Sequence, residues 1–161
     1  MTKVLVLGAG GQIARRATKM LSDEDVELTL FLRDVGKLAG APESARLVEG
    51  DVLDRERLDP AVRGQDVVYA SLAGELDAQA ARIVESMTAA GVQRLVFITS
   101  LGISDEVPGR FGEWNRRQIG PLLRPYRAAA DTIEESGLDY TILRPDRRRA
   151  GTVLSGITCL G

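Results

Sequence analysis

Short apolar segments alternate with longer amphipathic segments along most of the chain. The short segments are rich in β-branched residues and bounded by turn-forming residues, which predicts β-strands. They lie at 3–7, 27–32, 45–49, 66–70, 94–99 and 138–143, and the third is the weakest. The first segment is apolar at every position from Val4 to Leu7, as expected of a parallel strand that is buried on both faces.

The longer segments carry apolar residues at helical spacing and predict α-helices between the strands. A first helix follows the first strand and ends near Leu21, a second contains the inward stripe at 80–87 and ends at Gly91, and a third covers 127–135. Strands that alternate with helices through short loops are typical of a parallel sheet covered on both faces. We therefore expect an α/β fold with a doubly wound parallel sheet of six or seven strands in three α/β/α layers.

Two regions interrupt this alternation. Residues 103–125 contain several prolines and glycines, which predicts a long functional loop with a possible short helix at 114–119. The tail begins at Asp146 with a basic run, 147–149, which is most simply a solvated surface. The apolar segment 152–160 that follows is either a seventh strand or an end that formerly continued into a further segment.

The composition narrows the possible functions. The 161 residues carry a net charge of −2, no histidine and one cysteine. This length fits a single domain, 1–161, and the near-neutral charge gives no basis for nucleic-acid binding. Catalysis by imidazole, an internal disulfide and the common zinc sites are excluded, so we expect no metal. No apolar run approaches the ~20 residues of a membrane-spanning helix. We expect a soluble, cytoplasmic monomer or homodimer whose partner is a small-molecule substrate.

A glycine-rich segment, Gly8-Ala-Gly-Gly-Gln-Ile-Ala14, connects the first strand to the first helix. Gly8 and Gly11 allow a tight turn and a close approach of the backbone to a pyrophosphate, while the small Ala14 lets the helix pack against the strand. The N–H groups that begin the helix then face the anion. The spacing is G-x-x-G-x-x-A rather than the G-x-G-x-x-G of the dinucleotide fingerprint, and a purely structural turn is the alternative. Its position in an N-terminal βαβ unit favours nucleotide binding.

The residues after the second strand indicate which nucleotide is bound. NAD-binding proteins place a carboxylate there, whereas this strand is followed by Arg33-Asp34 and then Lys37. Arg33 can bind a 2′-phosphate through two parallel hydrogen bonds and Lys37 adds a second positive charge, which favours NADP(H) over NAD(H). The alternative is a solvated arginine and lysine that pair with Asp34. After the third strand, Asp51 is placed to meet an adenine, although a helix cap at Asp54 also explains this acidic stretch.

Five segments together resemble one family, the NmrA-like NAD(P)H-binding group of the atypical short-chain dehydrogenase/reductases. They are 6–15, 31–34, 49–54, 94–102 and 137–145, and the resemblance is continuous from Lys3 to about Pro145. It implies a Rossmann-like fold. It also implies a set of cofactor contacts: the pyrophosphate at Gly8, Gly10, Gly11, Gln12 and Ile13; the 2′-phosphate at Arg33 and Lys37; the adenine at Asp51 and Val52; and the remainder of the cofactor at Ser71, Leu72, Thr99 and Pro145.

The catalytic residues implied by the resemblance are Ser100 and Tyr126. In the wider superfamily a lysine four residues after the tyrosine lowers the tyrosine pKa, so that the phenol can exchange a proton with a carbonyl. Here Ala130 occupies that position, and no lysine follows Lys37 in the chain. A backbone cap by the hydroxyl of Ser100 and packing of Tyr126 at a helix start are the structural alternatives.

These features predict an NADPH-dependent oxidoreductase that acts on a small acceptor such as a quinone, a flavin or a carbonyl compound. A quinone or flavin acceptor does not require the missing lysine, because the cofactor supplies the chemistry and the protein supplies orientation. The alternative is a non-catalytic NADP(H)-binding redox sensor or regulatory module. Relatives continue after the Arg-Pro of 144–145 with a substrate-side segment, which we expect to be short, altered or missing here.

Overall fold

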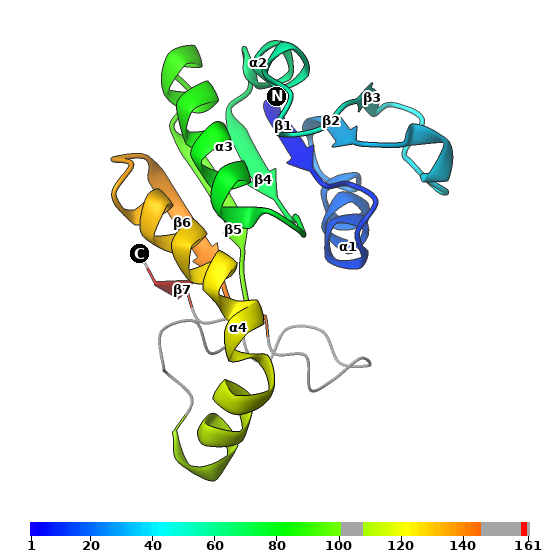
Figure 1. Ribbon diagram of the computed structural model, residues 1–161. Helices are drawn as coiled ribbons and strands as arrows, with labels where there is room; N and C mark the ends of the chain where they lie inside the picture. Colours follow the sequence, from blue (N-terminus) through cyan, green and yellow to red (C-terminus); the bar gives the residue numbers. More distant parts are fainter. Residues whose placement is uncertain (101–107, 146–158, 161) are drawn as a thin grey trace.

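The computed structural model describes residues 1–100, 108–145 and 159–160 (Figure 1). At 115, 116, 118, 119, 159 and 160 it describes the backbone alone. Its strands are β1 (Thr2–Leu7), β2 (Val26–Leu32), β3 (Arg46–Glu49), β4 (Val67–Ala70), β5 (Arg94–Ile98), β6 (Asp139–Leu143) and β7 (Cys159–Leu160). Its helices are α1 (Gln12–Leu21), α2 (Arg55–Val62), α3 (Leu76–Ala90) and α4 (Gly109–Glu134), with a 3-10 turn, η1 (Val35–Lys37), after β2. Each of the six short apolar segments therefore forms a strand, as predicted.

The strands form one sheet in the order β3-β2-β1-β4-β5-β6-β7. Strands β1 to β6 pair in parallel, and β7 pairs antiparallel to β6. The chain runs outward from β1 to β3, returns to place β4 beside β1, and then runs outward in the other direction. This is the doubly wound Rossmann order, and its switch point lies between β1 and β4.

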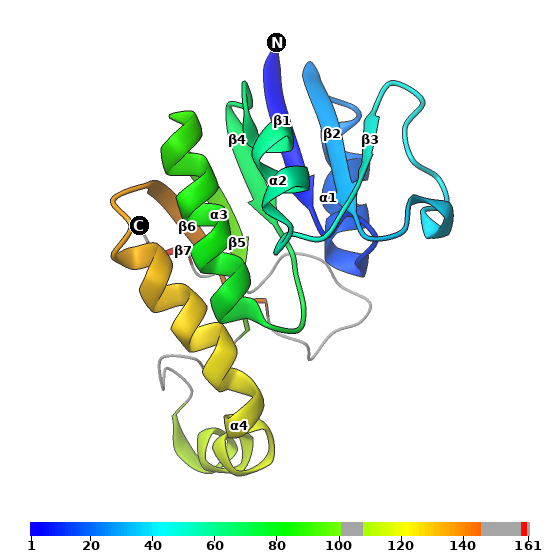
Figure 2. The same ribbon diagram turned by 45° about the horizontal axis from the view of Figure 1, so that its top comes forward.

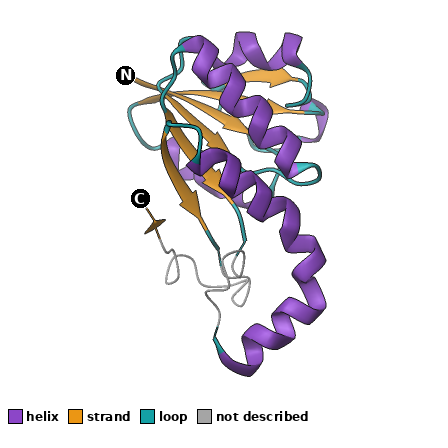
Figure 3. Ribbon diagram, turned by 60° about the vertical axis from the view of Figure 1, so that its left-hand side comes forward, coloured by secondary structure: helices purple, strands orange, loops and turns teal. Residues whose placement is uncertain are grey.

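Helices cover both faces of the sheet, with α1 on one face and α2, α3 and α4 on the other (Figures 2 and 3). Strand β1 contributes to a buried cluster on each face: Val4 and Val6 pack with α1 and β2, whereas Leu5 and Leu7 pack with the helices of the opposite face. All four side chains are at most 5% exposed. The continuous apolar pattern of β1 is thus explained by burial on both sides.

The expected loop at 103–125 is wrong over 109–125 except for the possible short helix at 114–119, which forms part of a much longer helix. Helix α4 begins at Gly109 and runs through Pro121 and Pro125. Each proline removes one backbone N–H from the helix, which usually ends or bends it. The helix continues here, and it bends in its first half (Figure 1). Leu123, Ala130 and Ile133 recur at helical spacing and join the buried cluster, so tertiary packing compensates for the lost hydrogen bonds. Residues 103–107 of that expectation lie outside the described residues.

The other helix predictions agree with the structure. Helix α1 ends at Leu21, and α3 ends at Ala90 directly before Gly91, which has a left-handed conformation (φ 72°) that favours glycine. Helix α2 was not predicted, although its cap was: the Asp54 carboxylate accepts a hydrogen bond from the N–H of Glu56. Within the described part of the chain, no helix has both the length and the hydropathy needed to cross a bilayer.

The tail contributes an antiparallel strand rather than a further parallel one. Of the apolar segment 152–160, only Cys159–Leu160 belongs to the described residues, and these pair with Leu143 and Ile142 of β6. The sheet therefore has the six parallel strands that were predicted, and the seventh strand offered for the tail is present as a short antiparallel one. The basic run 147–149 lies outside the described residues.

Candidate functional site

The carboxyl ends of β1 to β6 meet at one edge of the sheet. The register pairs Leu7 with both Phe31 and Ala70, and Ile98 with Leu143, so that the strands end side by side. In doubly wound folds a ligand binds along this edge, beside the switch point. The structure brings together here the residues that follow each strand: Gly8, Gly10, Gly11, Gln12, Ile13, Arg33, Asp51, Ser71, Leu72, Thr99, Ser100 and Pro145.

The glycine-rich segment 8–14, which we call the phosphate loop after its predicted ligand, is attached to the neighbouring strands through Gly8. The N–H groups of Gly8 and Ala9 both donate to the carbonyl of Phe31, at 3.0 and 3.2 Å. Gly8 has φ +76°, and a Cβ at this position would overlap the carbonyl oxygen of Ser71. Glycine is therefore required here by conformation and by the close approach of the chain after β4.

Helix α1 begins without an internal partner for its first N–H groups. Its N-cap is Gly11, which has no side chain to accept a hydrogen bond, and its first turn contains no acidic residue. The first N–H groups of a helix have no acceptor within the helix, and the helix dipole places partial positive charge on them. Ala14 is completely buried against the strand layer, whereas Ile13 is 41% exposed. These features fit the pyrophosphate of a dinucleotide, which brings its own negative charge.

Two of the predicted cofactor residues, Arg33 and Lys37, lie in the turn after β2 and differ in whether an ion pair holds them. The Lys37 Nζ lies 3.3 Å from Asp34 Oδ2. For Lys37, the structure therefore contains the ion pair with Asp34 that the sequence left as an alternative. Asp34 also caps η1 by accepting from the N–H of Gly36 at 3.0 Å. Arg33 is exposed, and no ion pair joins it to a described residue. Arg33 is therefore the cation of this turn that is available to an incoming phosphate.

The residues after β3 and β4 mainly stabilise the backbone turns at this edge of the sheet. Asp51 is exposed and its Oδ1 accepts from the N–H of Leu53 at 2.9 Å, so part of its hydrogen-bonding capacity stabilises its own turn. Val52 is 4% exposed and belongs to the buried cluster, which leaves little of its side chain for an adenine. Ser71 and Leu72 are half-buried beside the phosphate loop, and the N–H of Ser71 donates to Leu7.

The residues after β5 and β6 lie on the other side of the switch point. The N–H and the hydroxyl of Thr99 both donate to the carbonyl of Leu143, at 2.8 and 3.1 Å, so Thr99 joins these strands. Ser100 and Pro145 are half-buried at the same edge. Arg144 is 5% exposed, which places a buried arginine at the end of β6, next to this edge.

Tyr126 lies on α4 and packs against the buried cluster between that helix and the sheet. The position four residues later, Ala130, is 3% exposed in the same cluster. No lysine therefore stands beside Tyr126 on this helix face. Burial raises the pKa of Tyr69 on β4, so this second tyrosine is a poorer source of phenolate than a solvated one. Among the described residues, no group of three or more histidine, cysteine, aspartate or glutamate side chains could hold a metal ion.

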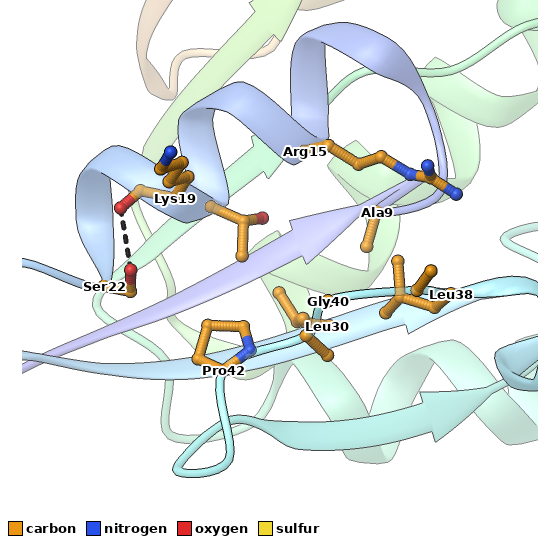
Figure 4. A pocket seen from close by; sticks show the side chains of 11 residues that line it. Ala9, Arg15, Lys19, Ser22, Leu30, Leu38, Gly40 and Pro42 are labelled. Carbon is orange, nitrogen blue, oxygen red and sulfur yellow. Dashed lines mark hydrogen bonds between the residues drawn. The ribbon is translucent and has the colours of Figure 1, made fainter.

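A cavity of about 430 Å³ lies behind the phosphate loop, between α1, β2 and the segment 38–42 (Figure 4). Apolar side chains such as Leu30, Leu38 and Pro42 form much of its lining, and Arg15 and Lys19 of α1 also border it. Arg15 is the last residue of the segment 6–15 that carries the family resemblance, and the sequence indicates no role for it. Helical spacing could not predict that Arg15 lies beside the turn after β2, because the spacing of residues on α1 says nothing about how a distant turn packs against that helix.

Comparisons with known proteins agree with this geometry. The model of an NAD(P)H-binding family matches residues 8–152. A Rossmann-fold NAD(P)-binding family protein from Shigella flexneri has 45% sequence identity and a TM-score of 0.74, over 90% of this chain and 67% of that one. A short-chain dehydrogenase/reductase from Veillonella parvula, solved in complex with NADP, has 28% identity and a TM-score of 0.82, over 89% of this chain and 68% of that one.

A reductase is among the curated relatives. The (4-alkanoyl-5-oxo-2,5-dihydrofuran-3-yl)methyl phosphate reductase of Streptomyces griseus is 28% identical over 142 residues, which are 88% of this chain and 46% of the relative. The chain thus spans less than half the length of that reductase. The family match itself begins at Gly8 and continues past Pro145, so it includes the residues after each strand that form the site. The chain belongs to the NAD(P)H-binding family, among the NmrA-like, atypical short-chain dehydrogenase/reductases.

Proposed function

We propose that this protein is an NADPH-dependent oxidoreductase that binds NADP(H) in preference to NAD(H) and acts on a small acceptor. The observation that carries the proposal is the uncapped start of α1 together with the exposed Arg33 after β2. The helix start fits a pyrophosphate, which both cofactors have. Arg33 fits a 2′-phosphate, which only NADP(H) has, because a guanidinium can donate two parallel hydrogen bonds to a phosphate.

The remaining cofactor contacts follow the edge of the sheet. The N–H groups at Gly10, Gln12 and Ile13 bind the pyrophosphate in this proposal, and Asp51 accepts a hydrogen bond from the adenine. The N–H of Gly11 donates to the carbonyl of Gly8 at 3.0 Å, so Gly11 contributes the close approach of its backbone. Ser71 and Leu72 lie along the ribose, and Pro145 lies near the nicotinamide. Val52 and Thr99 hold their turns in place rather than contacting the cofactor through side chains, because both side chains are buried. Lys37 contributes to the 2′-phosphate site indirectly, because its ion pair with Asp34 holds the turn after β2.

The acceptor is a quinone, a flavin or a carbonyl compound bound near Ser100. When bound, the nicotinamide supplies a hydride to such an acceptor. The hydroxyl of Ser100 orients the acceptor by donating a hydrogen bond to its oxygen. Tyr126 has no lysine beside it, so we expect this phenol to pack or contact substrate rather than deliver a proton efficiently. The reductase name of the Streptomyces relative supports redox chemistry, without indicating the acceptor here.

The experiment that tests the proposal follows NADPH absorbance against a panel of quinones, flavins and aldehydes. We expect turnover with at least one quinone or flavin, and Tyr126→Phe is expected to reduce it less than about a hundredfold, because general acid catalysis contributes about 10²–10⁴-fold only when the pKa is matched. A thousandfold loss in Tyr126→Phe with unchanged cofactor affinity would show that an unidentified group activates Tyr126.

The second candidate function is a non-catalytic NADP(H)-binding redox sensor or regulatory module. The buried Ala130 favours it, since the usual proton-donating pair is incomplete. Tight NADPH binding with no oxidation of NADPH by any acceptor of the panel would favour this candidate over the oxidoreductase.

A further inference from the structure

Arg15 is the fourth residue of α1, and its side chain reaches the turn that follows β2. Its Nη2 donates to the carbonyl oxygen of Lys37 at 3.3 Å. Figure 4 shows the side chain extending from α1 past Ala9 toward the segment that carries Leu38. One N–H of the guanidinium is thereby used, and the fork of this side chain has several others. Arg15 is exposed, so these donors face solvent.

The charges around this turn are unequally compensated. Lys37 pairs with the Asp34 carboxylate at 3.3 Å, and the same carboxylate caps η1. A phosphate that approached Lys37 would therefore also meet the negative charge of Asp34. No ion pair joins Arg15 to a described carboxylate. The Glu49 carboxylate also borders the turn, where it accepts a hydrogen bond from the N–H of Val35 at 3.1 Å. Among the described residues, Arg15 and Arg33 are the cations of this corner that no ion pair holds.

Hydrogen bonds connect the segments that carry the two arginines to the same turn. The phosphate loop is bonded to the end of β2 through the two N–H groups that donate to Phe31, and Arg33 follows that strand directly. The N–H of Lys37 donates to the carbonyl of Asp34, which closes the turn that Arg15 contacts. Arg33 enters the corner from β2, and Arg15 enters it from α1.

We infer that Arg15 is a cofactor-specificity residue that binds the 2′-phosphate of NADP(H) together with Arg33, whereas Lys37 orders the turn through Asp34. The inference rests on the proposed function, since it assigns a residue to the proposed 2′-phosphate site. It differs from the sequence-based expectation, in which Lys37 was the second cation. Arginine suits the role because its planar fork can bind the turn and a phosphate oxygen at the same time.

The test is a fluorescence titration of the full chain with NADPH, NADH, adenosine 2′,5′-bisphosphate and adenosine 5′-monophosphate. For Arg15→Gln we expect about a ten- to hundredfold weaker affinity for the two ligands that carry a 2′-phosphate, as for the loss of a hydrogen bond between charged groups. The affinity for the other two ligands should change less than about twofold. Arg15→Lys should give an intermediate loss, because it keeps the charge and loses the fork.

Arg16→Gln is the matched control, because Arg16 is exposed on the same turn of α1 but does not border the cavity or contact the turn after β2. It should change none of the affinities, and Lys37→Gln should change them less than about threefold. A wild-type preference for NADPH that survives in Arg15→Gln overturns this inference and leaves the proposed function intact. An equal loss for all four ligands also overturns it, since Arg15 would then only support the loop. Equal wild-type affinities for NADPH and NADH overturn the proposed NADP(H) preference and this inference with it.

Discussion

Helices α1 and α2 begin at the same edge of the sheet, after β1 and β3, but their first turns differ. Helix α2 carries its own anions. The Asp54 carboxylate caps it by accepting a hydrogen bond from the N–H of Glu56 at 3.0 Å, and the Glu56 side chain adds a second negative charge to the first turn. Helix α1 has Gly11 as its cap and no acidic residue in that turn. Since a helix start attracts negative charge, α2 satisfies this attraction within the chain, and α1 leaves it for a ligand.

The comparison shows how little sequence separates a structural helix start from a binding one. Both helices follow a parallel strand and both first turns lie at the edge where doubly wound folds bind ligands. Two carboxylates distinguish them: the cap at Asp54 and the first-turn Glu56 of α2 have no counterpart at the start of α1. Changes at the two caps and in the loop before α1 therefore test the account.

The largest effect is expected for Gly8→Ala. The new Cβ would overlap the Ser71 carbonyl in a backbone with φ +76°, and we expect a loss of about 3 kcal/mol of stability, from left-handed strain and overpacking together, with no detectable NADPH binding. Urea unfolding and NADPH titration measure both. Gly64→Ala is the control, because Gly64 has φ +74° with no atom within 4 Å of its Cβ position, and it should cost only about 1 kcal/mol. Equal stability of the two variants would contradict the close approach at Gly8.

A smaller but more specific effect is expected for Gly11→Asp, which gives α1 the kind of cap that α2 has. The backbone of Gly11 (φ −72°, ψ 156°) suits a capping aspartate, and its Cβ position meets only ordinary van der Waals contact. The carboxylate would occupy the N–H groups and repel a pyrophosphate, so NADPH affinity should fall about ten- to hundredfold while the melting temperature stays the same or rises slightly. Gly11→Ser, which adds a neutral cap, should lose less. Unchanged NADPH binding in Gly11→Asp would refute the anion role of this helix start.

The smallest effect on binding is expected for Asp54→Ala. Removal of this cap should destabilise the protein by about 1 kcal/mol, and NADPH affinity should change less than about twofold because α2 binds no ligand in this account. Asp54→Ser, which keeps a capping oxygen, should recover most of the stability. A large loss of NADPH affinity in Asp54→Ala, with the fold intact, would mean that both helix starts serve the cofactor.

The strands, the phosphate loop and the cap at Asp54 could be predicted because their determinants are local. A β-branched run such as Arg94–Ile98 forms a strand in nearly any parallel sheet, and a glycine loop between a strand and a helix has few other uses. Once the strands are parallel, their carboxyl ends must meet, so the residues after them form one edge without further information. The fold and the backbone of the site follow from these patterns.

The features that could not be predicted depend on contacts between distant segments. The first half of α4 was expected to be a loop because its prolines normally end a helix, and only the burial of residues such as Leu123 explains why it continues. The pairing of Lys37 with Asp34, rather than its availability to a phosphate, was one of two open alternatives in the sequence. The contact of Arg15 with Lys37 joins α1 to an irregular turn, for which hydrophobic periodicity gives no signal.

The most direct test of the account is amide NMR of the protein during titration with NADPH. The account predicts large, saturable chemical-shift changes for the N–H groups of Gly10, Gln12 and Ile13, at and just before the start of α1, and only small changes for Glu56 and Arg57 in the first turn of α2. Changes confined to the start of α2, or a titration in which the residues of the phosphate loop do not move, would contradict it.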